Sequence, residues 1–238
     1  LNYEANEIDN IELLDTSSKD GHRIYIRGIL YIMAKALNEV YPEALLSVNY
    51  QLSSAMFCKI DNMEITDEMI ANVKARMQEI INQNLEIRKV VMTKEEAEEF
   101  YSNEKTLRGI VQIDNTQKEG VSLYYCEDYF NYFFGVMPVT TAYTDIFDVI
   151  KYGDGFLVRY PSAEKPNELT NYKSNKKLLS TLEEYEDIHR VLQIDTLYKL
   201  NKEIKEGRTS NVILLSEALH EKKMANIADD IAKRKNVK

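Results

Sequence analysis

The 238-residue chain has no tryptophan, and its only cysteines are Cys58 and Cys126. Two cysteines are too few for a disulfide framework, and no signal peptide is visible, so we expect a cytoplasmic protein. Only four prolines and eight glycines occur, which argues against a low-complexity or disordered chain. No apolar run approaches the length of a membrane span, so we expect no membrane contact.

Histidine is also scarce, with His22, His189 and His220 as the only copies. None lies at metal-ligand spacing from a cysteine or another histidine, so no metal site is expected. The phosphate-binding motif G-x-x-x-x-G-K-[ST] and the motifs G-x-G-x-x-G and G-x-S-x-G are absent. The net charge of −9 makes nucleic acid an unfavourable partner. We therefore predict no catalytic residues and no cofactor in this chain.

Hydrophobic periodicity predicts an α+β fold, in which a central helix packs on a mixed or antiparallel sheet and a C-terminal helical extension follows. The central helix is expected from Ile24 to Tyr41 and is apolar nearly all round, which indicates burial on most of its surface. Strands are expected over residues 47–52, 55–60, 86–91, 110–113, 121–125, 145–151 and 156–160. Further helices are expected over 66–81, 93–101, 178–191, 194–206 and 210–234.

Residues 23–61 and 65–101 together resemble the second accessory domain of threonyl-tRNA synthetase. In that family the domain hydrolyses mischarged tRNA, with an H-x-x-x-H pair on the helix and a C-x-x-x-H pair on a later segment. Residues 124–143 lie where the synthetases carry the later pair. Alignment on Pro42 and Gly135 puts the helix pair on Arg27 and Tyr31 and the later pair on Phe133 and Met137.

A resemblance over nearly the whole chain is to the N-terminal accessory region of bacterial uridine-kinase-like proteins. It is carried by residues 20–28, 124–143, 155–161, 166–169 and 182–234. Such proteins join a TGS domain, the synthetase-like domain and a P-loop nucleoside kinase. The resemblance implies four segments, which are the tail or linker of a missing TGS domain (1–20), the accessory domain (21–161), a loop (162–177) and a helical extension toward an absent kinase domain (178–238). ATP and Mg²⁺ are expected only for that kinase domain.

The replacement of all four editing residues predicts that editing chemistry is lost, because arginine stays protonated and Phe133 and Met137 supply neither thiolate nor base. The vacated cleft then becomes a candidate ligand pocket. Its expected lining is Arg27, Tyr31, Tyr129, Phe133 and Met137. Arg27 with Tyr31 could clamp a small anion or carbonyl, or Arg27 could pair with Glu127 or Asp128 as a structural contact.

The aromatic run from Tyr124 to Phe134 allows core packing or base stacking, and the absence of basic residues between Val121 and Ile150 favours packing. Cys126 lies at the end of an expected strand, beside the carboxylates of Glu127 and Asp128. Nearby negative charge disfavours a thiolate, so we do not expect Cys126 to be a nucleophile.

The leading hypothesis is a non-catalytic accessory domain of a uridine-kinase-like ATP-dependent nucleoside kinase, with a regulatory or ligand-binding role. The alternatives are a relic or altered tRNA-editing hydrolase and a structural spacer between TGS and kinase domains. The expected partners are the missing TGS and kinase domains. The sequence leaves open whether the chain also binds a small anion, a nucleoside or a second copy of itself.

Overall fold

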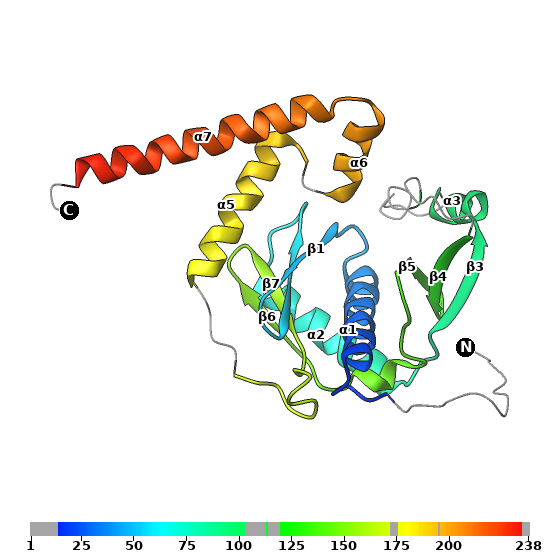
Figure 1. The fold of residues 1–238 in the computed structure, drawn as a ribbon. Coiled ribbons are helices and arrows are strands. Elements are labelled where there is room, and N and C mark those ends of the chain that lie inside the picture. The colour runs from blue at the N-terminus through cyan, green and yellow to red at the C-terminus, as the bar shows by residue number, and fades with distance from the viewer. Residues whose placement is uncertain (1–13, 103–112, 114–119, 172–175, 195, 235–238) are drawn as a thin grey trace, which may run out of the picture. The chain divides into compact units, whose positions relative to one another are not determined.

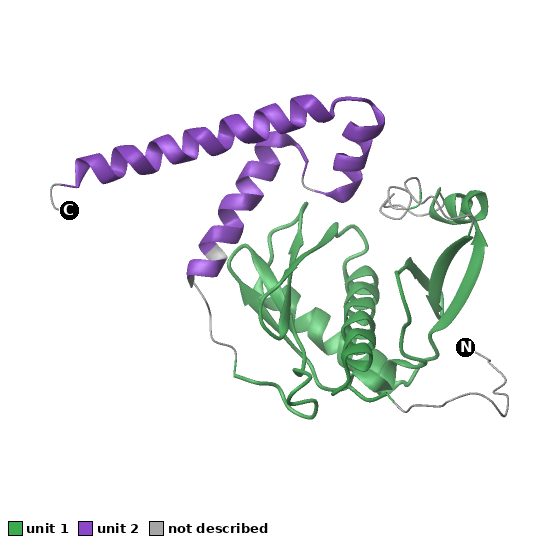
Figure 2. Cartoon of the chain, viewed as in Figure 1, with its two compact units in different colours: residues 1–172 green, residues 173–238 purple. Residues whose placement is uncertain are grey.

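The computed structural model describes residues 14–102, 113, 120–171, 176–194 and 196–234 (Figure 1). The chain divides into two compact units, Leu1–Tyr172 and Lys173–Lys238 (Figure 2). The boundary lies within the segment 162–177 that was expected to be a loop. Each unit is described below by itself.

The first unit is an α+β structure that contains two antiparallel sheets (Figure 1). Its four-stranded sheet has the order β1-β2-β7-β6, and its three-stranded sheet has the order β3-β4-β5. The elements are α1 (Lys19–Val40), β1 (Leu46–Gln51), β2 (Ala55–Ile60), α2 (Asp67–Asn82), β3 (Arg88–Thr93), α3 (Lys94–Ser102), β4 (Gly120–Cys126), β5 (Tyr129–Tyr132), the short 3₁₀ helix η1 (Thr141–Thr144), β6 (Asp148–Tyr152) and β7 (Gly155–Arg159).

Helix α1 lies between the two sheets, which explains why it is apolar nearly all round (Figure 1). One part of its surface packs with α2 and the four-stranded sheet in the main core, which includes Ile29, Met33 and Phe156. Another part, which includes Tyr31 and Ala34, packs against side chains of the three-stranded sheet. A helix that buries two opposite sides cannot show the single apolar stripe of a surface helix.

The three-stranded sheet also has two covered faces. Tyr124 and Cys126 of β4 face the α1 side, whereas Val121 and Leu123 pack with Ala97 of α3. This alternation follows from the period of two residues along a strand. A capping box opens α3, because the Thr93 amide donates to Glu96 and the Glu96 amide donates to the Thr93 hydroxyl, at 2.8 and 3.2 Å.

Several predicted boundaries differ from the structure. Helix α1 begins at Lys19 rather than Ile24, because the Ser18 hydroxyl accepts a hydrogen bond from the Gly21 amide and caps the helix earlier. All strand pairs among the described residues are antiparallel, which confirms the antiparallel alternative of the predicted sheet. The strand expected at 110–113 lies outside the described residues except for Ile113, which is helical and buried. The expected linker 1–20 is described only from residue 14.

The second unit is helical, as predicted. It contains α5 (Lys176–Leu192), α6 (Leu197–Lys205) and α7 (Thr209–Lys233). No residue whose side chain is described in these three helices is buried. In the described part of the chain, no helix is both long and apolar enough to cross a membrane.

Candidate functional site

One face of α1 presents Arg27, Tyr31 and Lys35 at intervals of four residues. This face meets β4, β5 and the segment after β5. The positions that the synthetase resemblance singles out therefore come together in space, since Arg27 and Tyr31 lie on the helix while Phe133 and Met137 lie on the later segment. We call Arg27, Tyr31, Phe133 and Met137 the editing-position cluster.

Arg27 is half-buried and is held by the backbone of the later segment. Its Nη1 donates to the carbonyl of Val136 at 3.2 Å. The guanidinium lies against Gly135, where a Cβ atom would come within 2.7 Å of Arg27 Cζ. Gly135 also has φ of 101°, a conformation that favours glycine. Glycine at position 135 thus permits both the turn and the close approach of Arg27.

The structural pairing expected for Arg27, with Glu127 or Asp128, was wrong. The guanidinium of Arg27 donates instead to the backbone carbonyl of Val136. Glu127 instead pairs with Lys35 at 3.3 Å. The reason is geometric, because Glu127 occupies the turn between β4 and β5, two helical turns along α1 from Arg27.

Tyr31 is fully buried and uses its hydroxyl for structure. The hydroxyl donates to the backbone carbonyls of Tyr124 and Tyr129, which lie 3.0 and 3.2 Å away. Its ring meets those of Tyr129 and Phe133 edge to face, with centroids 5.3 and 5.7 Å apart. Burial raises the pKa of the Tyr31 phenol far above its usual value, so this hydroxyl is no base near neutral pH.

Met137 and Tyr129 complete the packing around Tyr31. Both are buried, at 6% and 8% exposure, in one hydrophobic cluster with Tyr31, and Phe133 packs against that cluster. The five residues predicted to line a pocket are therefore adjacent, and four of them contact one another as core. The aromatic run supplies packing at Tyr124 and Tyr129, as favoured from the sequence.

Sequence reasoning missed Lys35, the next residue on this face of α1. Its side chain is 2% exposed, and its Nζ lies 2.7 Å from Glu39 and 3.3 Å from Glu127. It also donates to the carbonyl of Cys126 at 3.3 Å. The available signal was the four-residue step from Tyr31 within an otherwise apolar helix. A lysine at such a position has to find carboxylates inside the fold.

The ion pairs continue from α1 to α2. Glu39 accepts from Arg76 at 2.6 Å, and Arg76 also donates to Glu79 at 2.7 Å. Burial raises the pKa of Glu39, but the hydrogen bonds from Lys35 and Arg76 outweigh it, so the pKa of Glu39 lies below its usual value. Lys35 and Arg76 thus keep Glu39 ionised and tie the two helices together.

The remaining reactive side chains nearby are poorly placed for catalysis. Burial raises the pKa of the Cys126 thiol to about 11, although Lys35 acts in the opposite direction. A thiol in that state is protonated at neutral pH and is a weak nucleophile. Among the described residues, no group of three or more histidine, cysteine or acidic side chains is arranged to hold a metal ion.

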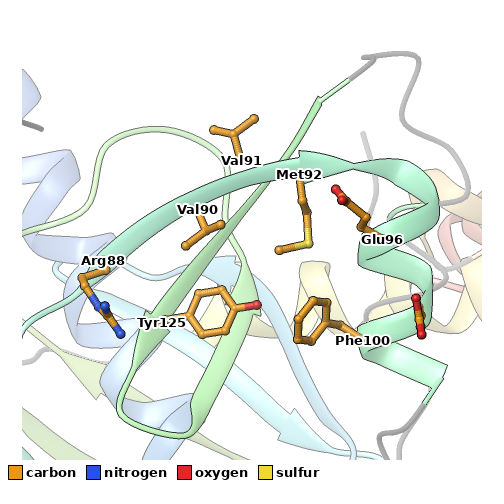
Figure 3. Close-up of a pocket in the computed structure, with 8 residues that line it drawn as sticks. Arg88, Val90, Val91, Met92, Glu96, Phe100 and Tyr125 are labelled. Atoms are coloured by element: carbon orange, nitrogen blue, oxygen red, sulfur yellow. The ribbon is translucent and has the colours of Figure 1, made fainter.

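A pocket of about 530 Å³ lies on the other face of the three-stranded sheet (Figure 3). Strand β3 and helix α3 form its sides, with Tyr125 of β4 at its base. Its lining residues are Arg88, Val90, Val91, Met92, Glu96, Glu99, Phe100 and Tyr125. None of the residues predicted from the synthetase resemblance belongs to it.

The chain is distantly similar to threonine–tRNA ligases over much of its length. It is 25% identical over 206 residues to a probable cytoplasmic threonine–tRNA ligase of Enterocytozoon bieneusi, which covers 86% of this chain and 32% of that protein. It is 25% identical over 189 residues to the threonine–tRNA ligase of Thermoplasma volcanium, which covers 76% of this chain and 28% of that protein. A third relative, from Clostridium kluyveri, is 24% identical over 126 residues, or 52% of this chain and 20% of the ligase.

The chain thus spans a fifth to a third of the length of these curated relatives. No protein-family model matches the chain. The similarity supports the part of the resemblance that concerns the synthetase, and these comparisons do not associate the chain with a uridine kinase.

Proposed function

We propose that this chain is a non-catalytic accessory domain, related to a threonyl-tRNA synthetase domain, whose editing positions have become structural. One observation carries the proposal. At the positions aligned with the editing residues, Tyr31, Phe133 and Met137 pack on one another and Arg27 is tied to a backbone carbonyl. Hydrolysis of an aminoacyl ester needs a general base and a positioned water, and this cluster contains neither an imidazole nor a thiolate.

The test is a deacylation assay with mischarged tRNA and the full chain. We expect hydrolysis no faster than in a no-protein control. The rival hypothesis, a relic hydrolase, predicts turnover that depends on nearby polar groups. Turnover above the control that disappears in Lys35→Met and persists in the surface variant Lys222→Met would overturn the proposal. Turnover above the control that stays with the chain through further purification would also overturn the proposal, whether or not it depends on Lys35.

A ligand-binding form of this role centres on Arg27. The guanidinium is half-buried, and an arginine has five donor hydrogens, of which one contact to the Val136 carbonyl is in place. Inorganic phosphate, uridine and uridine monophosphate are suitable probes. A rise in melting temperature that is absent in Arg27→Ala, while Arg23→Ala retains it, would support binding at this position. No shift with any probe would favour the spacer role.

The finer proposal is that the domain serves a uridine-kinase-like nucleoside kinase. It is supported by the resemblance over residues 20–28, 124–143, 155–161, 166–169 and 182–234, which extends through all of α7. The deciding observation is the parent coding sequence beyond Lys238. A strand followed by G-x-x-x-x-G-K-[ST] would support the kinase association, and its absence from the parent protein would remove it.

A further inference from the structure

Helix α7 carries an apolar stripe that the described part of its unit leaves exposed. The stripe contains Ile213, Met224, Ile227 and Ile231, whose exposures are 53%, 55%, 46% and 47%. A different part of the helix is half-buried, at Val212, Ser216, Leu219 and Lys223. Lys223 there forms an ion pair with Glu184 of α5. The exposed stripe is therefore distinct from the surface that α7 uses within its own unit.

The spacing of the stripe is that of a coiled coil. From Ile213 the positions continue on α7 at Glu217, His220, Met224, Ile227 and Ile231, and then at Arg234, the residue that follows the last turn of the helix, in alternating steps of four and three residues. We call these seven residues the α7 seam. A repeat of 3.5 residues keeps a seam facing one partner helix along its whole length. The pattern therefore indicates a partner helix with the same repeat, and a second copy of α7 has that repeat.

We propose that two copies of this chain associate through their α7 seams in a two-fold, antiparallel coiled coil. In the proposed register Met224 lies opposite Ile227 of the partner subunit. His220 then lies opposite Ile231 of the partner subunit, and Glu217 lies opposite Arg234 of the partner subunit. The two-fold axis repeats each layer, so the apolar residues occupy the centre and an opposite-charge pair closes each end.

Charge selects this direction over the parallel one. A parallel, in-register pair would place the two Glu217 side chains opposite each other and would do the same with Arg234. Like charges in facing seam positions are destabilising, whereas the antiparallel register converts them into two ion pairs. The flanking positions agree, because Lys223 lies opposite Asp230 of the partner subunit in the same register. Lys223 can then bridge between Glu184 of its own chain and that aspartate.

The size of the seam sets the expected strength. The overlap from Glu217 to Arg234 measures about 27 Å at roughly 1.5 Å per residue, which is about two and a half heptads. A coiled coil this short is weak, so we expect the dimer to dissociate on dilution. This inference is independent of the proposed function, since it involves no residue of the editing-position cluster.

Sedimentation equilibrium of the full chain over a hundredfold range of concentration tests the proposal. We expect the mass to rise from 27.7 kDa toward twice that value. Ile227→Glu should raise the dissociation constant at least tenfold. Asn226→Glu adds the same charge at the neighbouring position outside the seam and should leave it within twofold of the unaltered chain. Circular dichroism verifies that both variants keep their helix content.

A charge exchange tests the direction. Glu217→Arg and Arg234→Glu should each weaken the dimer, and the double variant should restore it, because the pair is re-formed with reversed signs. A double variant no tighter than either single variant would overturn the antiparallel register. A chain that is monomeric at every concentration would overturn the dimer itself. A monomer in which Ile227→Glu lowers the melting temperature would show that the chain covers its own stripe, which also overturns it.

Discussion

Two buried tyrosines differ in whether their hydroxyl groups have a hydrogen-bond partner. Tyr31 and Tyr160 are 0% and 1% exposed, but the Tyr31 hydroxyl donates to carbonyls, whereas the Tyr160 hydroxyl has no hydrogen-bond partner among the described residues. We expect Tyr31→Phe to lower the free energy of unfolding by about 1–2 kcal/mol. Tyr160→Phe should leave it unchanged or raise it by up to about 1 kcal/mol, because it removes an unpaired polar group.

Urea unfolding of both variants checks this contrast, and each serves as the control for the other since both lose the same atom. A Tyr160→Phe variant as destabilised as Tyr31→Phe would show that the Tyr160 hydroxyl has a partner in solution. The result matters for the site, because a structural hydroxyl at position 31 is what makes the editing-position cluster core rather than pocket.

Two substitutions of Lys35 can separate how much its packing and how much its charge contribute to stability. Its carboxylate partners remain in contact with water, since Glu39 and Glu127 side chains are 28% and 51% exposed. Loss of the ammonium therefore leaves no deeply buried charge. We expect Lys35→Ala to lower the free energy of unfolding by about 2–4 kcal/mol through the cavity it creates. Lys35→Met, which keeps the methylene chain, should cost less than half as much in the same urea titration. Equal losses would contradict this and would assign the stability to the ion pairs.

At the scale of elements, the ion pair of Glu39 with Arg76 joins α1 to α2 and makes their packing depend on pH. The folded state lowers the pKa of Glu39, so its contribution to stability is present above the unfolded value of about 4.3 and is lost as pH falls through the lower folded value. Glu39→Gln should therefore reduce the loss of stability in this acidic window. Glu79→Gln is the matched control, because Glu79 pairs with the same arginine but is 62% exposed and should change the profile little. A series of urea titrations from neutral to acidic pH measures both.

The elements themselves could be predicted largely from local signals. Helices were expected to begin at Thr66 and Thr93, and the structure has a side-chain cap at each of these residues. The start of α1 was missed because Ser18 and the preceding turn compete with the apolar periodicity that begins at Ile24. Local chemistry decides where a helix begins, and tertiary packing decides which of its faces is buried.

The site was harder to predict than the elements. Alignment on Pro42 and Gly135 pointed to positions on the helix and on the later segment, and the structure places these positions side by side. It could not show that Tyr31, Phe133 and Met137 would fill the space between them, because filling depends on ring orientations and on hydrogen bonds to distant carbonyls. Lys35 was missed for the same reason, since Glu127 lies 92 positions along the chain and reaches it only in the folded protein.

At the scale of the whole molecule, the two units differ in how they are stabilised. The three hydrophobic clusters lie entirely within the first unit, whereas the second has no buried residue among those whose side chains are described.

We expect a fragment of residues 1–172 to fold alone and to unfold cooperatively, with a melting temperature close to that of the full chain. A fragment of residues 173–238 should melt gradually and lose much of its helix content on dilution, because helices without tertiary burial are marginal in water. Circular dichroism against temperature and concentration measures both fragments. Cooperative unfolding of the second fragment at the highest dilution would contradict the prediction, since it would require a core that a single copy supplies. Helix content that rises with concentration, and that Ile227→Glu removes, would instead tie the order of this unit to its association through α7.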